Sequence, residues 1–240
     1  MSIIDELLIL LDDSQSRELD AIKKILPKRT LQTVSSTLGR LEAKGWIKII
    51  KQKNKNLYQI TPSGQEEITN NLQEIKAMPK SKWNGMWQIV SFNVPEKIRF
   101  ARDAFRLKLE MLGFGKIQNS IWISAWDNKT KLDKIIEDLA INKYVMYFST
   151  GKLSEVDQKK IASSFEWDWN ELNKKYREFL NQATVFSLSK KTVHQAKTLV
   201  YWYAKILKND PKFPQEIQPK GYLGNKAFEA YQRIRPYCYK

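Results

Sequence analysis

The chain has 240 residues, and 41 lysines and arginines against 26 aspartates and glutamates give it a formal net charge of +15. This length predicts two or three domains, and the positive charge predicts a polyanionic partner, most often nucleic acid. With one cysteine, Cys238, and one histidine, His194, the sequence excludes an internal disulfide framework and speaks against a zinc site. The single cysteine also fits a reducing environment, so we expect a cytoplasmic protein.

An anionic membrane is the rival to nucleic acid as the partner of so basic a chain, but the sequence predicts no membrane-spanning segment. No apolar run approaches the roughly 18 residues that a membrane span needs. The N-terminal segment has no basic lead-in, so we expect no signal peptide, and it carries four early acids: Asp5, Glu6, Asp12 and Asp13.

Two short helices are predicted first in chain order. Ile3 to Leu11 is apolar nearly throughout. The second helix is predicted over Ser16 to Leu26 and closed by Pro27. Its inward-facing residues recur at helical spacing: Leu19, Ile22, Ile25 and Leu26.

A third helix is predicted between Thr30, which can cap its start, and Gly45, where a helix stops. Its buried stripe recurs every three or four residues: Leu31, Val34, Leu38 and Leu41. The helical turn places a face of mostly small polar side chains on the opposite, solvent side: Gln32, Thr33, Ser36 and Arg40.

A hairpin with a basic tip follows the third helix. Trp46 to Gln52 and Leu57 to Ile60 are predicted strands, joined by a turn over Lys53 to Asn56. Between Lys28 and Lys55 there are eight basic residues and one acid, which gives 8 − 1 = +7. The first 78 residues hold only 12 basic and 10 acidic side chains, so the charge is concentrated in this segment. Three helices followed by such a hairpin are typical of a winged helix-turn-helix.

We expect the third helix to contact base edges in a major groove, because arginine and glutamine can pair with bases through two hydrogen bonds. The hairpin would meet phosphates or the minor groove and supply affinity more than sequence preference. The alternative is an ordinary solvated helix face and a charged turn that keeps a hairpin soluble. The candidate DNA-binding residues are Arg29, Gln32, Thr33, Ser36, Arg40, Lys44, Lys51, Lys53, Asn54 and Lys55.

A fourth helix is predicted from a capping box formed by Ser63 and Glu66, and a linker follows at residues 79–84. Beyond it, strands are predicted over Trp87 to Val94 and Tyr144 to Ser149, and Ile117 to Ser124 is predicted to supply one or two strands. Helices with apolar stripes lie between them, so the order β-α-β-β-α-β is ferredoxin-like.

The last part of the chain is predicted to be helical. One helix holds Trp167 and Tyr176, another includes Leu199 to Leu207, and a last one spans Ala227 to Ile234. The predicted fold class is therefore α+β. It comprises a winged helix domain at 1–78, a ferredoxin-like domain at 85–153 and a helical domain at 154–240.

With these residues in view, the chain resembles the PaaX family of phenylacetate-degradation repressors over nearly its whole length. The matching stretches are TVSSTLGRLEAKGWI, WNGMWQIVSFNVPEKIRFARDAFRLKLEMLGFGKIQNSIWIS, WDWNELNKKYREFL and DPKFPQEIQPKGYLG. The resemblance implies a homodimeric transcriptional repressor that binds double-stranded DNA. Its effector would be an aryl- or acyl-coenzyme A thioester. No cofactor is expected.

An effector pocket is expected between the central and helical domains. The candidate lining residues are aromatic, Trp122, Tyr147 and Trp202, although such residues are more often core and interdomain packing. The segment Lys220 to Gly224 lacks an acidic-Trp-Pro step that the family has at this point. If that loop shapes the pocket, the ligand could differ.

The central domain also resembles the small CRISPR adaptation endonuclease, which has an aspartate at the end of its first strand. Here Asn93 stands at that position, and asparagine is a weaker ligand for a hard cation. The nearest acid, Glu96, could stabilise the start of the next helix. The basic residues of that helix, which include Arg99 and Arg106, are expected on an outer face or as a second nucleic-acid or effector-phosphate contact.

The sequence therefore predicts a DNA-binding transcriptional regulator, most often a repressor, without catalytic residues or a metal. Two winged helices in a homodimer would engage two half-sites. The alternatives are a metal-dependent nuclease built on the central domain and a nucleic-acid scaffold that binds no small ligand.

Overall fold

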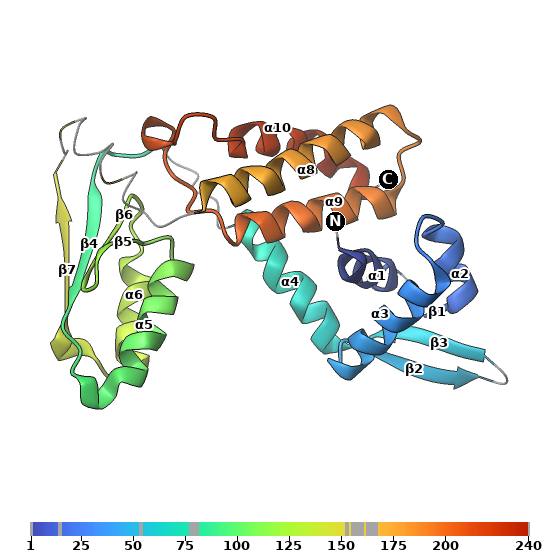
Figure 1. Ribbon diagram of the computed structural model, residues 1–240, viewed down its shortest axis with the longest axis horizontal. Helices are drawn as coiled ribbons and strands as arrows, with labels where there is room; N and C mark the ends of the chain where they lie inside the picture. Colours follow the sequence, from blue (N-terminus) through green and yellow to red (C-terminus); the bar gives the residue numbers. More distant parts are fainter. Residues whose placement is uncertain are drawn as a thin grey trace. The chain divides into compact units, whose positions relative to one another are not determined.

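The computed structural model describes residues 2–13, 16–52, 55–76, 82–151, 154, 161 and 168–239 (Figure 1). Helices and two antiparallel sheets both contribute, so the predicted α+β class is confirmed. The chain forms two compact units. The first unit comprises Met1–Ala77, Lys174–Ile206 and Leu223–Lys240, and the second comprises Met78–Asn173 and Leu207–Tyr222. The three-domain division stays a prediction, and residues 79–81 of the linker lie outside the described residues.

The N-terminal part of the first unit combines four helices with a three-stranded sheet. Two of its strands, β2 and β3, form the expected hairpin, and β1 joins β3 on the other side, in the order β1-β3-β2. The elements in chain order are α1 (Ile3–Asp12), β1 (Arg17–Glu18), α2 (Leu19–Ile25), α3 (Leu31–Ala43), β2 (Ile47–Gln52), β3 (Lys55–Ile60) and α4 (Pro62–Lys76).

The strand β1 corrects the predicted second helix. Arg17 pairs with Tyr58 of β3, so the chain is extended here and α2 begins three residues later than Ser16. Ile22 and Leu26 are buried as predicted, but Ile25 is 38% exposed. The sequence therefore predicted the helical spacing of the buried residues correctly. It predicted too wide a buried face, because α2 is only two turns long.

The helix α3 begins and ends where the sequence predicts. The Thr30 hydroxyl accepts a hydrogen bond from the Thr33 backbone N–H at 3.1 Å, and Gly45 ends the helix with φ of 70°. Three of the four predicted apolar positions are buried, but Leu31, the first helical residue, is 50% exposed. Thr37 takes the fourth buried position and donates its hydroxyl hydrogen to the Thr33 carbonyl at 2.7 Å.

The helix α4 is fixed closely to the base of the hairpin. The predicted capping box at Ser63 is wrong, because the Thr61 hydroxyl accepts from the Gly64 N–H at 3.2 Å and donates to the Gly45 carbonyl at 2.6 Å. Pro62 then occupies the first helical position, where its missing N–H costs nothing. A Cβ on Gly64 would lie 2.2 Å from the Trp46 carbonyl oxygen, so glycine permits this approach.

The first unit is completed by helices from the end of the chain. These are most of α8 (Trp169–Leu188), α9 (Val193–Leu207) and α10 (Gly224–Ile234), followed by a short 3-10 helix at Arg235–Tyr239. Aromatic rings join them: Tyr203 lies 5.0 Å from Tyr231 and 5.4 Å from Phe179, measured between ring centroids. Trp167, predicted in the first of these helices, lies outside the described residues.

The helix α9 packs against the N-terminal elements through a contact that we call the α9 contact. Tyr201 belongs to the same buried core as α1 and α3, and its hydroxyl accepts from the Asn71 amide at 3.1 Å. Lys205 Nζ lies 2.8 Å from Asp5 Oδ1, and the Asp5 side chain is only 3% exposed. Lys197 forms a second ion pair, with Asp13.

The second unit contains a four-stranded antiparallel sheet in the order β5-β6-β4-β7. Its elements follow the predicted β-α-β-β-α-β order: β4 (Trp87–Phe92), α5 (Arg99–Met111), β5 (Gly115–Gln118), β6 (Ile121–Ser124), α6 (Lys129–Asp138) and β7 (Val145–Thr150). Short 3-10 helices occur at Glu96–Ile98, Asn142–Tyr144 and Gln215–Ile217.

Each face of this sheet is covered differently. The helices α5 and α6 lie side by side on one face, where Phe105 and Leu132 pack with Val90 (Figure 1). On the other face Phe213 and Ile217, from the segment Leu207–Tyr222, pack on residues of β4 and β6. The indole N–H of Trp126 fastens this segment by donating to a backbone carbonyl at 2.7 Å.

Candidate DNA-binding surface

The outer face of α3 presents the predicted polar side chains to solvent. Gln32, Thr33, Ser36 and Arg40 are all exposed. Two of them are held by local hydrogen bonds: the Thr33 hydroxyl lies 2.7 Å from that of Thr30, and the Ser36 hydroxyl donates to the Thr33 carbonyl at 3.2 Å. This face therefore offers short, ordered side chains that allow a close approach to another surface.

Arg40 is the one cation on this helix face. Its Nη2 donates to the Thr37 hydroxyl at 3.0 Å and its Nε to the Ser36 carbonyl at 3.5 Å, so it folds back along α3. No acidic side chain in the described part of the chain pairs with it. Its neutral hydrogen bonds can be exchanged for a charge-assisted contact at little cost.

The hairpin carries further cations toward its tip. Gln52 pairs with Lys55 at the end of the β2–β3 ladder, so the turn is shorter than predicted. Lys53 and Asn54, both predicted to contact DNA, lie outside the described residues. Lys51 and Lys48 of β2 are exposed, and Lys48 was not among the predicted residues although it lies on the same strand.

Two predicted DNA-binding cations have acidic partners within the chain. Arg29 donates to both carboxylate oxygens of Glu6, at 2.9 and 3.1 Å, and this contact raises the pKa of Arg29. Lys55 Nζ lies 2.9 Å from a carboxylate oxygen of Glu18, which belongs to the adjacent strand β1. The Lys55 pair is exposed, and the Glu6 side chain is only 11% exposed. Arg29 therefore has a structural role whether or not it also meets DNA.

The remaining cations of this segment have no acidic partner in the described residues. Of the eight basic residues between Lys28 and Lys55, two are paired with acids and Lys53 is not described, which leaves five. One of these, Lys44, lies over the Trp46 ring at 4.4 Å. We call the outward residues of α3 and the neighbouring cations the α3–β2 surface: Gln32, Thr33, Ser36, Arg40, Lys44, Lys48 and Lys51.

The predicted effector residues lie in both units. Trp122 and Tyr147 flank Val90 from β6 and β7, so they come together on the helix-covered face of the sheet. The Tyr147 hydroxyl donates to Gln88 Oε1 at 2.7 Å, and burial raises the pKa of the Tyr147 hydroxyl. Trp202, in α9 of the first unit, packs edge-on against Phe179 with ring centroids 5.9 Å apart. All three have packing roles, and effector binding by them stays a prediction.

The positions relevant to nuclease activity have structural partners. The backbone N–H of Asn93 donates to the Tyr144 carbonyl at 2.9 Å. The Glu96 carboxylate accepts from Arg102 at 2.7 Å and lies 4.0 Å from Arg99. Among the residues that the structure describes, no group of three or more histidines, cysteines or acids is placed to hold a metal ion.

The α9 contact was not predicted from the sequence. The ion pair between Asp5 and Lys205 joins residues 200 positions apart, and the hydrogen bond between Asn71 and Tyr201 joins residues 130 apart. An acid within an apolar helix such as Ile3–Asp12 was the available signal, because a buried carboxylate needs a partner. None of the described helices is long and apolar enough to cross a membrane.

Two family models match the chain after its first four helices. The model described as PaaX protein central Cas2-like domain matches residues 80–162, and the model described as PaaX-like protein C-terminal domain matches residues 167–239. The chain belongs to the PaaX family. The central PaaX model spans the four-stranded sheet with α5 and α6, and the C-terminal PaaX model spans α8, α9 and α10.

One named relative agrees with this assignment to the PaaX family, and one solved structure shares the fold. The transcriptional repressor PaaX of Escherichia coli (strain K12) is 20% identical over 219 residues, which cover 85% of this chain and 69% of the relative. The solved structure of the uncharacterized protein Rv0674 from Mycobacterium tuberculosis matches with a TM-score of 0.51 at 15% identity. That match covers 87% of this chain and 81% of the other, and it concerns the fold alone.

Proposed function

We propose that this PaaX-family protein is a transcriptional repressor that binds double-stranded DNA in a sequence-specific manner. The first 77 residues would act as a winged helix, with α3 in the major groove and the β2–β3 hairpin on the flanking backbone. The relationship to the transcriptional repressor PaaX of Escherichia coli supports the regulatory role. The DNA-binding role rests on the surface itself.

The observation that carries the proposal is the α3–β2 surface. Arg40 stands among short polar side chains on a capped helix, which is the arrangement that direct reading of base edges requires. The lysines of this surface lack acidic partners in the described part, so phosphate contacts would replace condensed counterions without breaking internal ion pairs.

A homodimer is part of the proposal, because a twofold arrangement would present two copies of α3 to two half-sites. The four-stranded sheet of the second unit has the strand order of a ferredoxin-like domain, and we propose this name for it. Release by an acyl-coenzyme A effector follows from the family resemblance. We favour the repressor role over a nuclease, because Asn93 stands where the nuclease family has an aspartate and arginines engage the Glu96 carboxylate.

The proposal is tested by fluorescence-anisotropy titration of the protein on duplex from its own upstream region, with a scrambled duplex alongside. A preference of about a thousandfold for the native duplex is expected. Arg40→Ala should reduce affinity for the native duplex by about 10- to 100-fold, corresponding to one lost base contact, and change scrambled-duplex affinity much less. Arg233→Ala removes an exposed arginine of α10 and serves as the matched control.

Equal affinity for both duplexes would contradict a sequence-specific repressor and leave a general nucleic-acid binder. Equal losses on both duplexes from Arg40→Ala would contradict base reading by α3, because a phosphate contact weakens all sequences alike.

A further inference from the structure

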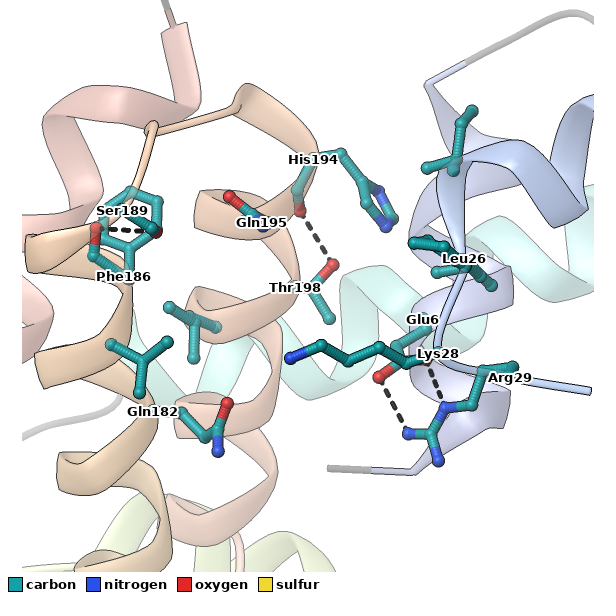
Figure 2. Close-up of a pocket in the computed structure, with 14 residues that line it drawn as sticks. Glu6, Leu26, Lys28, Arg29, Gln182, Phe186, Ser189, His194, Gln195 and Thr198 are labelled. Atoms are coloured by element: carbon teal, nitrogen blue, oxygen red, sulfur yellow. Dashed lines mark hydrogen bonds and ion pairs between the residues drawn. The ribbon is translucent and has the colours of Figure 1, made fainter.

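A cavity of about 500 Å³ lies inside the first unit, next to the start of α3 (Figure 2). One side consists of Glu6, Ile25 and the turn over residues 26–29, and the other consists of residues from α8 and α9. Small-molecule sites measure about 300–1,000 Å³, so the cavity has a suitable size for such a ligand.

The walls of the cavity offer apolar surface from both sides. Leu26, Phe186 and Leu199 are buried. Two further apolar side chains are incompletely covered: Ile25 at the end of α2 is 38% exposed and Val185 of α8 is 54% exposed. An apolar ligand body placed here would remove both from water, which is favourable in proportion to the area covered.

Several polar groups of the cavity already have partners. Both carboxylate oxygens of Glu6 accept from Arg29. The Thr198 hydroxyl donates to the His194 carbonyl at 2.7 Å, and the Ser189 hydroxyl donates to the Phe186 carbonyl at 3.3 Å. These groups form the fixed frame of the site.

Other polar groups of the cavity have no partner in the described part of the chain. Lys28 has no ion pair, and its side chain reaches from the turn before α3 toward α8 (Figure 2). The side-chain amides of Gln182 and Gln195 are also available. The Nδ1 atom of His194 is buried without a hydrogen-bond partner, and a buried polar atom without a partner is costly. Burial lowers the pKa of His194, so its imidazole is neutral near pH 7.

The charges around the cavity fit one negative charge on the ligand. Lys28 and Arg29 contribute two positive charges and Glu6 contributes one negative charge, which leaves one positive charge. A monoanion would balance it. A phosphate dianion would meet the Glu6 carboxylate with no second free cation to offset the repulsion.

We propose that this cavity binds a small organic acid, with its carboxylate at Lys28 and its apolar body between Ile25 and Val185. This ligand differs from a coenzyme A thioester, whose acyl end carries no charge. The ligand would tie the turn before α3 to the helices α8 and α9. Because Thr30 caps α3 directly after this turn, binding would change the placement of α3, provided that the ligand prefers one arrangement.

The site is tested by calorimetric titration of the full chain with octanoate and with octanamide, which has the same length and no charge. Octanoate should bind at least about tenfold more tightly than octanamide, as expected for a charge-assisted hydrogen bond. Lys28→Met should abolish this difference, and Val185→Ser should weaken both compounds. Lys24→Met is the control, because it removes an exposed lysine of α2 that does not line the cavity. This variant should bind octanoate with the affinity of the original protein.

Three outcomes would overturn the site: no saturable binding of octanoate at millimolar concentration, equal affinity for octanoate and octanamide, or unchanged octanoate affinity in Lys28→Met. Octanoyl-coenzyme A serves as a comparison ligand. If octanoyl-coenzyme A binds more tightly than octanoate, and Lys28→Met weakens its binding, then a free organic acid is the wrong ligand class for this cavity.

The regulatory part of this inference rests on the proposed function, and a separate measurement tests it. The affinity of the protein for the native and the scrambled duplex is measured with and without octanoate. Octanoate should change the affinity for the native duplex, and this change should be absent in Lys28→Met. Octanoate binding with unchanged affinity for a preferred native duplex would overturn the regulation and leave the site. A lack of preference between duplexes would instead overturn the proposed function, whatever octanoate does in the calorimeter.

Discussion

The α9 contact and the α3–β2 surface use the same kinds of side chain in opposite ways. In the α9 contact, Lys205 and Lys197 each pair with an aspartate, and Asp5 is almost fully buried. On the α3–β2 surface, Arg40 and Lys51 are exposed and have no acidic partner in the described residues. The paired cations hold elements in place, and the unpaired ones remain available to an external anion.

The difference shows that net charge alone does not locate a nucleic-acid site. Arg29 and Lys55 belong by sequence to the basic segment, but each has a carboxylate partner from another element. Removing a paired cation changes stability first, because it leaves an acid without its partner. Removal of an unpaired cation should change binding first.

The largest effect is expected from the α9 contact. Lys205→Met leaves the Asp5 carboxylate buried without its ammonium partner, so the free energy of unfolding should fall by about 3 kcal/mol. This value is at the lower end of the range for broken buried ion pairs, because the Lys205 side chain is partly exposed. Urea denaturation followed by circular dichroism measures the loss. Lys208→Met, an exposed lysine just beyond α9, should change stability little.

The double variant Asp5→Asn, Lys205→Met separates a lost pair from lost packing. If the unpaired charge causes the instability, the double variant should recover more than half of the loss. A double variant as unstable as Lys205→Met alone would show that the pair contributes little to the α9 contact.

A smaller effect, on binding and not on stability, is expected for Lys51→Ala. The slope of log affinity against log salt concentration on duplex DNA should fall by about 0.9, as expected for one phosphate contact. The protein should remain as stable as before, since Lys51 has no ion pair in the described residues. Lys24→Ala, with the same charge change on α2, should leave the slope unchanged. A slope that falls equally in both variants would indicate a general charge effect.

Glu18→Gln should change DNA binding in the opposite direction. It frees Lys55 from its carboxylate partner, so affinity for duplex DNA should rise a few-fold and the salt slope should become steeper. Asp20→Asn adds the same charge nearby on α2 without releasing Lys55, and it serves as the matched control. An equal rise in both variants would argue against a contact by Lys55.

The smallest effect concerns His194, beside the α9 contact. Its pKa is lowered mainly by burial; Asp13 and Glu6 oppose this shift, and Arg17 and Lys197 add to it. The unfolded chain therefore binds a proton more readily, so stability is fully present above the ordinary histidine pKa and declines as pH falls. Between pH 7.5 and pH 5.5, His194→Gln should lose less stability than the original protein in parallel denaturation curves. Identical losses would contradict a neutral buried imidazole.

Local signals in the sequence predicted much of the fold. The cap at Thr30, the stop at Gly45 and the paired strands of the hairpin depend on residues close together in the chain, and the structure contains all three. The errors also have local causes. Leu31 is exposed because it is the first residue of its helix, and Thr61 caps α4 in place of Ser63 because its hydroxyl also reaches the Gly45 carbonyl.

The candidate sites were less predictable than the elements that carry them. Outward placement of Gln32 and Arg40 follows from helical periodicity, whereas the pairing of Arg29 with Glu6 depends on how α1 packs beside the turn before α3. The cavity at Lys28 is formed by segments about 160 residues apart in the chain, and no pattern along the sequence indicates such a meeting.

The α9 contact also has a consequence for the order of events during synthesis. Asp5 leaves the ribosome about 10–40 s before Lys205, given elongation rates of about 5–20 residues per second. Throughout that interval Asp5 lacks its ammonium partner, and the part of the N-terminal core that Tyr201 covers stays open. A chaperone that shields this part of the N-terminal core during synthesis would shorten the period in which it can aggregate.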